Sequence, residues 1–284
     1  MYPSIDGWPI DRCQACGHAF CRGRFDTAHT ASQFDDRYFK GGGVGYPDYL
    51  AEPDIRRRLA RAYAKRLQAL AGAHGLTVPG SALDVGCAAG FMMQGLSDAG
   101  WRASGVDPNA SMVAHARHTL GLDAHVGQAE TLSRTLDLAV PANGFDLITL
   151  VQVVGHLIDP GRAVAEAVAV LAPGGLLLVE TWDSQSRIAR LFGTQWQELT
   201  PPNVLHYFTR ASLNRLMAGH GLSCLHTARV PKRLQVAHLR NFVRHRYALA
   251  GRMMAALMAP VPGRWSLPYP GDDLFFSIYR RERR

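Results

Sequence analysis

Residues 82–107 read ALDVGCAAGFMMQGLSDAGWRASGVD, and this stretch decides how the rest of the chain is organised. Its opening run, residues 82–85, is short, largely apolar and followed by a glycine, which predicts a buried strand entering a tight turn. Gly86 and Gly90 have no Cβ, so the backbone can bend sharply there and approach a ligand closely. The stretch therefore predicts a ligand-binding turn at the end of a strand.

The second half of the stretch predicts a helix and another strand. Residues 91–99 favour a short helix that Gly100 ends, and residues 102–106 favour a strand. Asp107 follows at the carboxyl end of that strand. A carboxylate at this position can accept hydrogen bonds from the two hydroxyls of a ribose.

A glycine-rich turn with an acid about 20 residues later suits two ligand classes, dinucleotides and S-adenosylmethionine. The dinucleotide fingerprint needs glycines spaced G-x-G-x-x-G, whereas Gly86, Ala88 and Gly90 form G-x-A-x-G, with Asp84 two residues before the first glycine. This pattern resembles motif I of the class I S-adenosylmethionine-dependent methyltransferases, in which the middle position is more often glycine. The spacing disfavours a nicotinamide dehydrogenase.

Three later motifs strengthen the resemblance. Residues 127–130, GQAE, stand where the family has an acidic or amide side chain against the adenine. Residues 145–151, FDLITLV, predict a buried strand, and Gly155-His156 follows where many relatives have Glu-His. Residues 172–180, APGGLLLVE, match the family's proline-glycine-glycine turn, which we expect to end a helix before a strand from residue 176.

The resemblance covers residues 81–181 and implies an α/β fold: a seven-stranded, mostly parallel Rossmann-like sheet with an antiparallel edge hairpin. A helical N-terminal arm and a helical insertion before the last strand complete it. The expected segments are an N-terminal arm with a CxxC knuckle and a glycine/aromatic loop (1–50), the methyltransferase core (51–230), the insertion (231–271) and the last core strand (272–284).

The same resemblance implies S-adenosylmethionine as cofactor and S-adenosylhomocysteine as product. The residues that we expect to bind the cofactor, by their place in the motifs, are Asp84, Gly86, Cys87, Ala88, Gly90, Phe91, Asp107, Pro108, Gln128, Ala129 and Val151.

Methyl transfer to a hydroxyl benefits from a nearby base, and histidine has a suitable pKa. His156 and His206 lie in loops at the expected pocket, and either is a candidate base. Tyr46, Tyr49 and Tyr207 are candidate substrate contacts. In the insertion, a helix is expected to place Leu239, Phe242, Val243, Leu249 and Met253 on one side and arginines on another, and to select the acceptor.

Three functions fit these features. The first is a methyltransferase acting on a small molecule, most often at oxygen, with an apolar and basic insertion suited to an organic anion. The second is an RNA methyltransferase, because the net charge is +8. The third is a non-catalytic S-adenosylmethionine-binding protein, because Ala88, Gln128 and Gly155 depart from the family pattern.

The remaining features concern metal and compartment. Cys13 and Cys16 have the spacing of a zinc knuckle, but no second pair follows, so we expect no metal. With five cysteines, no apolar N-terminal leader and no long unbroken apolar run, the chain is expected to be cytoplasmic and to have no membrane partner.

Overall fold

The computed structural model describes residues 4–41, 45–46, 48–51, 53–74, 78–136, 139–230, 233–236, 239–240, 244, 248–263, 265–268 and 271–282. It divides into two compact units. The larger combines residues 1–230 with 272–284, and the smaller consists of residues 231–271.

A seven-stranded sheet forms the centre of the larger unit, in the order β5-β4-β3-β6-β7-β12-β9. The five strands from β5 to β7 are parallel, and β12 is antiparallel to both β7 and β9. This confirms the predicted Rossmann-like sheet with its antiparallel edge. The strands are β3 (Ser81–Val85), β4 (Arg102–Asp107), β5 (Asp123–Val126), β6 (Phe145–Val151), β7 (Leu171–Trp182), β9 (Leu222–Arg229) and β12 (Leu274–Arg281).

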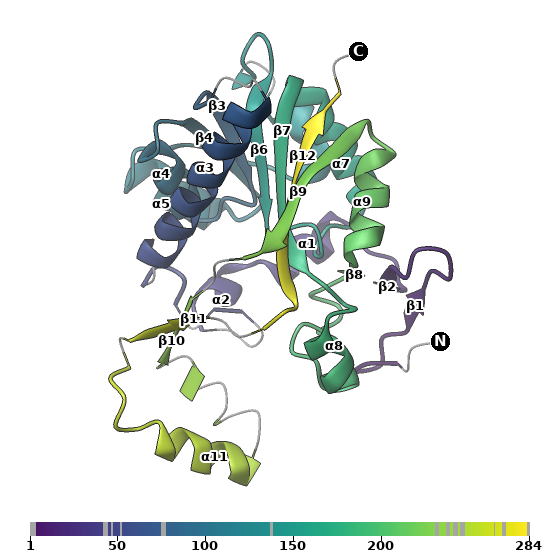
Figure 1. Ribbon diagram of the computed structural model, residues 1–284, viewed down its shortest axis with the longest axis vertical. Helices are drawn as coiled ribbons and strands as arrows, with labels where there is room; N and C mark the ends of the chain where they lie inside the picture. The colour runs from purple at the N-terminus through teal and green to yellow at the C-terminus, as the bar shows by residue number, and fades with distance from the viewer. Residues whose placement is uncertain are drawn as a thin grey trace. The chain divides into compact units, whose positions relative to one another are not determined.

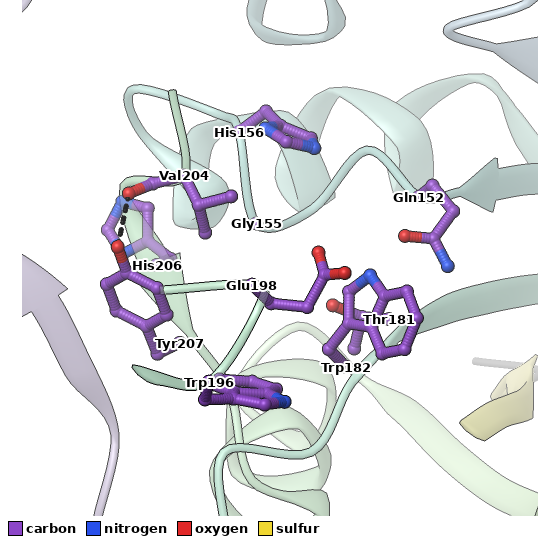
Figure 2. Close-up of a pocket in the computed structure, with 10 residues that line it drawn as sticks. All are labelled: Gln152, Gly155, His156, Thr181, Trp182, Trp196, Glu198, Val204, His206 and Tyr207. Carbon is purple, nitrogen blue, oxygen red and sulfur yellow. Dashed lines mark hydrogen bonds between the residues drawn. The ribbon is translucent and has the colours of Figure 1, made fainter. Parts of the chain in front are cut away.

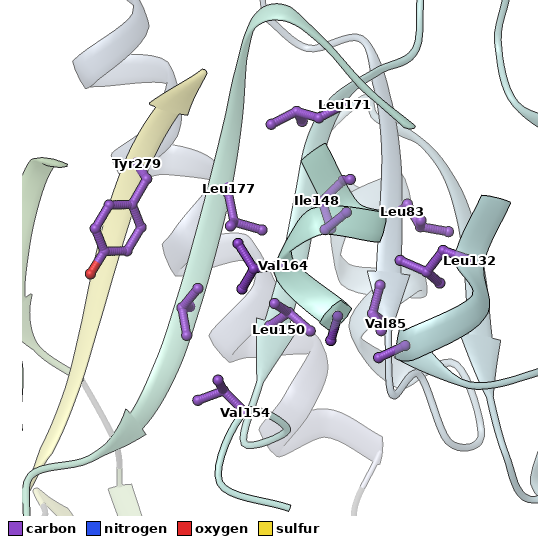
Figure 3. Packing of buried hydrophobic residues seen from close by; sticks show 14 of the residues in the cluster. Leu83, Val85, Leu132, Ile148, Leu150, Val154, Val164, Leu171, Leu177 and Tyr279 are labelled. Atoms are coloured by element: carbon purple, nitrogen blue, oxygen red, sulfur yellow. The ribbon is translucent and has the colours of Figure 1, made fainter. Parts of the chain in front are cut away.

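Helices cover both faces of the sheet (Figure 1). One face packs against α6, α7 and α9, whose apolar side chains share a core with the strands; Figure 3 shows Leu132 and Val164 beside Leu83, Ile148 and Leu150. The helices of this face are α6 (Leu132–Leu136), α7 (Pro160–Val170) and α9 (Arg210–Ala218), and those of the other are α3 (Pro53–His74), α4 (Phe91–Ser97) and α5 (Ala110–His118).

The Pro-Gly-Gly turn differs from the prediction. Helix α7 ends at Val170, and β7 begins at once with Leu171, so residues 173–175 lie inside the strand rather than before it. The pairing of β6 with β7 shifts register between Phe145 and Leu147, and Gly174 has φ +78°. Gly174 thus accommodates the register shift within the strand, because a residue with a side chain would be strained at this left-handed φ.

The N-terminal arm adds a second, smaller sheet. Strands β1 (Ile10–Arg12) and β2 (Ala19–Cys21) form a hairpin, and β2 also pairs with β8 (His206–Tyr207). Two helices follow, α1 (Thr27–Gln33) and α2 (Asp36–Phe39), and α2 lies in the stretch expected to be a loop. Helix α8 (Arg187–Phe192) packs Ala189 into the same apolar cluster as Ile10 and Tyr207.

The smaller unit contains strands β10 (Arg233–Gln235) and β11 (Ser266–Pro268), which pair antiparallel, and helix α11 (Ala248–Leu257). Phe242 and Val243, expected on an apolar helix face, lie outside the described residues. Met253, expected on the same face, is 63% exposed. No helix in the described part of the chain has the length and apolar character needed to cross a membrane.

Candidate active site

The glycine-rich turn lies between β3 and α4. Gly86, Ala88 and Gly90 have φ of +77°, +45° and +83°, and Ala88 is thus a non-glycine residue in a left-handed conformation. The amides of Gly86 and Cys87 both donate to the Val106 carbonyl, at 2.7 and 3.1 Å. These bonds tie the turn to the end of β4, where Asp107 lies.

Asp107 holds the turn with its side chain. Its Oδ2 accepts from the Ala88 amide and its Oδ1 from the Asn109 amide, both at 2.8 Å. Burial raises the pKa of this carboxyl to about 6, against the lowering effect of the two amides. Asp107, the residue predicted to bind a ribose, thus lies at the carboxyl end of β4 with its carboxylate fixed by backbone donors.

Asp84 is buried with one oxygen unsatisfied. Oδ1 accepts from the Thr149 hydroxyl at 2.6 Å, whereas Oδ2 has no hydrogen-bond partner within the described residues. Desolvation raises its pKa to about 7, and the nearby Asp107 charge adds to the shift. A buried carboxylate oxygen without a donor is costly, and a cation or donor of a bound ligand would satisfy it.

The residues present fit S-adenosylmethionine. The cofactor carries ribose hydroxyls, an ammonium and a sulfonium, and the turn offers two buried carboxylates of which one oxygen is unsatisfied. The Cys87 side chain is buried against Gly105, where any Cβ would lie 2.8 Å from Cys87 Sγ, so the predicted contact of Cys87 with the cofactor would be made by its backbone.

Four other residues predicted to bind the cofactor lie at or just after the carboxyl ends of β4, β5 and β6. Pro108 follows β4, Gln128 precedes Ala129 after β5, and Val151 ends β6. Ala129 is buried, and the other three are partly exposed. Phe91 begins α4 and is also buried.

The N-terminal arm packs aromatic side chains on the glycine-rich turn. Tyr49 stacks on Phe91 with ring centroids 5.7 Å apart, and both share a cluster with Ala88 and Ala89. The Arg56 guanidinium lies 4.0 Å from the centre of the Tyr49 ring and 4.8 Å from that of Tyr46. These two tyrosines, predicted as acceptor contacts, therefore lie beside the glycine-rich turn.

A small cavity opens at the carboxyl ends of β6 and β7 (Figure 2). The loop after β6, which supplies part of its lining, also packs on the glycine-rich turn, since a Cβ at Gly86 would lie 2.4 Å from Val153 in that loop. Its volume is about 20 Å³, the space of one water molecule. The lining residues are Gln152, Gly155, His156, Thr181, Trp182, Trp196, Glu198, Val204, His206 and Tyr207.

His156 is oriented by the protein backbone. Its Nδ1 lies 2.8 Å from the Asn203 carbonyl oxygen, which can only accept, so Nδ1 carries the proton. Nε2 is then the basic nitrogen and has no hydrogen-bond partner among the described residues. Burial lowers the pKa of His156, so the ring is neutral near pH 7. This is the arrangement of a histidine able to accept a proton.

His206 also reaches the cavity, but its ring is already engaged. Its Nδ1 lies 3.1 Å from His18 Nε2, and it hydrogen-bonds the Ile158 backbone as well. Burial lowers the pKa of both histidines to about 4. Tyr207 also lines the cavity with its polar group already engaged, because its hydroxyl donates to the Val204 carbonyl at 2.9 Å. Of the two predicted bases, His156 has the better geometry.

Gln152 is held by a buried carboxylate. Its Nε2 donates to Glu180 Oε1 at 2.8 Å, and the Tyr63 hydroxyl donates to the other oxygen of Glu180. Glu180 and Tyr63 are fully buried. Because Nε2 faces Glu180, the amide oxygen of Gln152 is turned towards the other lining residues in Figure 2. Gln152 has φ +61°, a conformation that non-glycine residues adopt rarely.

Several residues that line the cavity were not predicted from the sequence. The rule that ligands bind at the carboxyl ends of strands would have found Thr181 and Trp182 at the end of β7. Trp196, Glu198 and Val204 carry no sequence signal, since loops bring them to the cavity.

The CxxC knuckle forms the turn of the N-terminal hairpin, where the Gly17 amide donates to the Cys13 carbonyl. No group of three or more metal-binding side chains occurs in residues that the structure describes. His18 of this segment instead contacts His206, and its ring lies tilted against that of Phe208 with the ring centroids 4.5 Å apart. The absence of zinc remains a prediction.

Comparison with known proteins agrees with this geometry. Residues 55–227 match a family described as a methyltransferase domain. The chain belongs to this family. The methyltransferase-domain match spans β3 to α9 and hence the glycine-rich turn, both carboxylates and both candidate histidines.

Individual relatives cover less of the molecule. A ubiquinone biosynthesis O-methyltransferase of Bradyrhizobium sp. (strain ORS 278) is 33% identical over 129 residues, 45% of this chain and 48% of the relative. Another, from Rhodopseudomonas palustris (strain HaA2), is 24% identical over 59% of this chain and 66% of its own length. The chain thus spans about half the length of the first of these curated relatives.

Solved structures show the same fold. Magnesium protoporphyrin IX methyltransferase from Synechocystis PCC 6803, solved with bound SAH, has a TM-score of 0.54 at 15% identity, covering 90% of this chain and 100% of that one. A putative methyltransferase from Haloferax volcanii, solved with its Trm112 activator, has a TM-score of 0.53 at 16% identity, covering 79% and 95%. This methyltransferase-domain protein therefore has their sheet architecture.

Proposed function

We propose that this protein transfers a methyl group from S-adenosylmethionine to a hydroxyl group of a small organic acceptor. The observation that carries the proposal is His156, which lines the cavity and whose basic nitrogen has no hydrogen-bond partner among the described residues, in a loop that also packs on the glycine-rich turn. The turn supplies the two carboxylates suited to the cofactor. The O-methyltransferase relatives support oxygen as the methyl acceptor.

In the proposed reaction, S-adenosylmethionine supplies the methyl group. Asp84 and Asp107 bind it, and the N-terminal arm with Tyr49 covers the turn and excludes water. The acceptor hydroxyl would give its proton to His156 Nε2 as its oxygen bonds the methyl carbon, and the carbon–sulfur bond would break with its electron pair on sulfur, which leaves S-adenosylhomocysteine. Asn203 holds the imidazole through Nδ1, so the base is fixed in the required tautomer.

The lining favours an acceptor that is neutral and donates hydrogen bonds. Glu198, Gln152 and His156 contribute a carboxylate, an amide and an imidazole to it, and no Lys or Arg is among the described residues that line it. This differs from the sequence-based expectation of an organic anion. Trp182 and Trp196 offer flat apolar surfaces that suit an aromatic ring.

Acceptor binding requires side chains to move, since the cavity holds only about 20 Å³. A second cavity of about 250 Å³ shares Trp196 and Tyr207 with it and is otherwise largely apolar. It offers room for an apolar substituent of the acceptor.

The test uses calorimetry and a methyl-transfer assay. Wild-type protein is expected to bind S-adenosylmethionine and to methylate phenols and catechols in preference to aromatic carboxylates lacking a hydroxyl. Asp107→Ala should weaken cofactor binding through the lost carboxylate. Cofactor binding without transfer to any hydroxyl would support the non-catalytic alternative, and unchanged affinity in Asp107→Ala would contradict the assigned cofactor site.

A further inference from the structure

The smaller unit, residues 231–271, has a positive charge that its own sequence does not neutralise. It contains seven Lys and Arg residues and no Asp or Glu. It therefore supplies +7 of the net charge of +8, although it makes up about a seventh of the chain. Within the described residues, Arg244 and Arg252 are both exposed. Such a charge suits an anionic surface.

Helix α11 in this unit turns apolar side chains to the solvent. Gly251 and Ala255 are buried, whereas Met253 is 63% exposed, Met254 48% and Leu257 81%. Met253 and Leu257 are four residues apart and therefore neighbours on one side of the helix. A surface helix of a globular protein ordinarily turns its polar side outward, and here the outward side is apolar except for Arg252.

Two further large apolar side chains are exposed near β11. Trp265 is 57% exposed and Leu267 45%. Of the large apolar residues that the structure shows exposed, most thus belong to this small unit. Exposed methionine, leucine and tryptophan together with uncompensated arginine are typical of segments that lie in the interface of a membrane.

We propose that residues 231–271 bind the surface of a bilayer that contains anionic lipids. The arginines lie against the lipid phosphates, and Met253 and Leu257 enter the boundary between headgroups and acyl chains. RNA would neutralise the same arginines but would leave the methionine and leucine side chains in water, so the apolar side decides between the two. Peripheral binding of this kind needs no spanning helix, and it revises the expectation of no membrane partner.

The experiment is sedimentation of the full-length protein with vesicles. Vesicles of phosphatidylcholine with about a third phosphatidylglycerol should carry the protein into the pellet at low salt, and pure phosphatidylcholine vesicles should retain far less. Leu257→Glu and Met253→Glu should each weaken binding roughly tenfold or more, because a charge replaces an inserted apolar group. Arg252→Gln should weaken it about fivefold.

Leu191→Glu is the matched control. Leu191 is 79% exposed, almost as exposed as Leu257, but belongs to α8 in the larger unit. The Leu191→Glu variant should bind anionic vesicles as the wild type does. Unchanged thermal melting and S-adenosylmethionine affinity in all variants would show that the substitutions act locally.

Three outcomes would overturn the proposal: no binding of the wild type to anionic vesicles, equal loss in Leu257→Glu and Leu191→Glu, or binding to RNA that vesicles do not displace. The last would favour the RNA methyltransferase alternative. Because vesicle binding is measured without methyl transfer, failure of this proposal and failure of the proposed function are distinguishable.

Discussion

Asp84→Asn should stabilise the ligand-free protein and weaken S-adenosylmethionine binding. Asp84 is 2% exposed, and burial raises its pKa from an ordinary value of about 3.9 to about 7. Because the folded-state pKa is raised, ionisation of Asp84 opposes folding above about pH 7, and this opposition fades as the pH falls towards the unfolded-state value.

The size of the effect follows from the shift. About 3 pKa units at about 1.4 kcal/mol each give a folding penalty of about 4 kcal/mol at pH 8, which falls to about 1–2 kcal/mol at pH 5. The asparagine keeps the hydrogen bond from Thr149, but its amide nitrogen replaces the unsatisfied Oδ2 and costs about 1–3 kcal/mol. The net gain is about 1–3 kcal/mol at pH 8, whereas at pH 5 the two contributions cancel to within about 2 kcal/mol and the variant can be the less stable protein.

Urea denaturation of both proteins at pH 5 and pH 8, without cofactor, measures this difference. Calorimetry at pH 8 should show cofactor affinity reduced tenfold or more in Asp84→Asn, because a charged acceptor is lost. Asp98→Asn, at an exposed carboxylate paired with Arg57 and Arg61, is the control and should leave affinity unchanged. A stability difference independent of pH, or wild-type affinity in Asp84→Asn, would refute the reasoning.

Three further substitutions separate the roles of the other buried groups. For the wild type, kcat/KM should rise with pH through an apparent pKa below the ordinary 6.5 of histidine and then stay level. His156→Gln should lose this rise and about 10²–10⁴-fold of the rate, while its affinity for the cofactor should be unchanged. A wild-type pH profile in the variant would exclude His156 as the base. Tyr63→Phe removes one hydrogen-bond donor from Glu180 and should lower the free energy of unfolding by about 1–3 kcal/mol in urea denaturation. It should also lower kcat, because Glu180 then holds Gln152 less firmly. An unchanged kcat would mean that the hydrogen bonds from Tyr63 to Glu180 and from Gln152 to Glu180 have no role in catalysis. His206→Asn should lower the free energy of unfolding by about 1 kcal/mol through the lost contact with His18, and it should keep the rise of kcat/KM with pH. Loss of that rise would reassign the base to His206.

The sheet and the glycine-rich turn could be predicted from the sequence because their signals are local. Asp84, Gly86, Gly90 and Asp107 lie within one short stretch, and the spacing itself implies a strand, a turn and a second strand. The expected edge hairpin is also present in β9 and β12. The Pro-Gly-Gly turn was misplaced because both residue types usually end elements, whereas the sheet accommodates them within β7 by a register shift.

The acceptor cavity could be predicted only in part, because distant segments build it. The Glu180–Tyr63 hydrogen bond joins residues 117 positions apart, and the His18–His206 contact joins residues 188 apart. No local pattern encodes such pairs. Both candidate histidines were chosen by their position in loops, but only the structure shows that His18 and the Ile158 backbone engage His206 while Asn203 orients His156.

The most direct test of the account is to incubate the protein with methyl-labelled S-adenosylmethionine and a fractionated cell extract, and to determine where the label appears. We expect label in the low-mass organic fraction, as a methoxy group by NMR, and we expect this label to be lost in His156→Gln. Label in RNA, or no label in any fraction while the cofactor is bound, would contradict the proposed small-molecule O-methyltransferase.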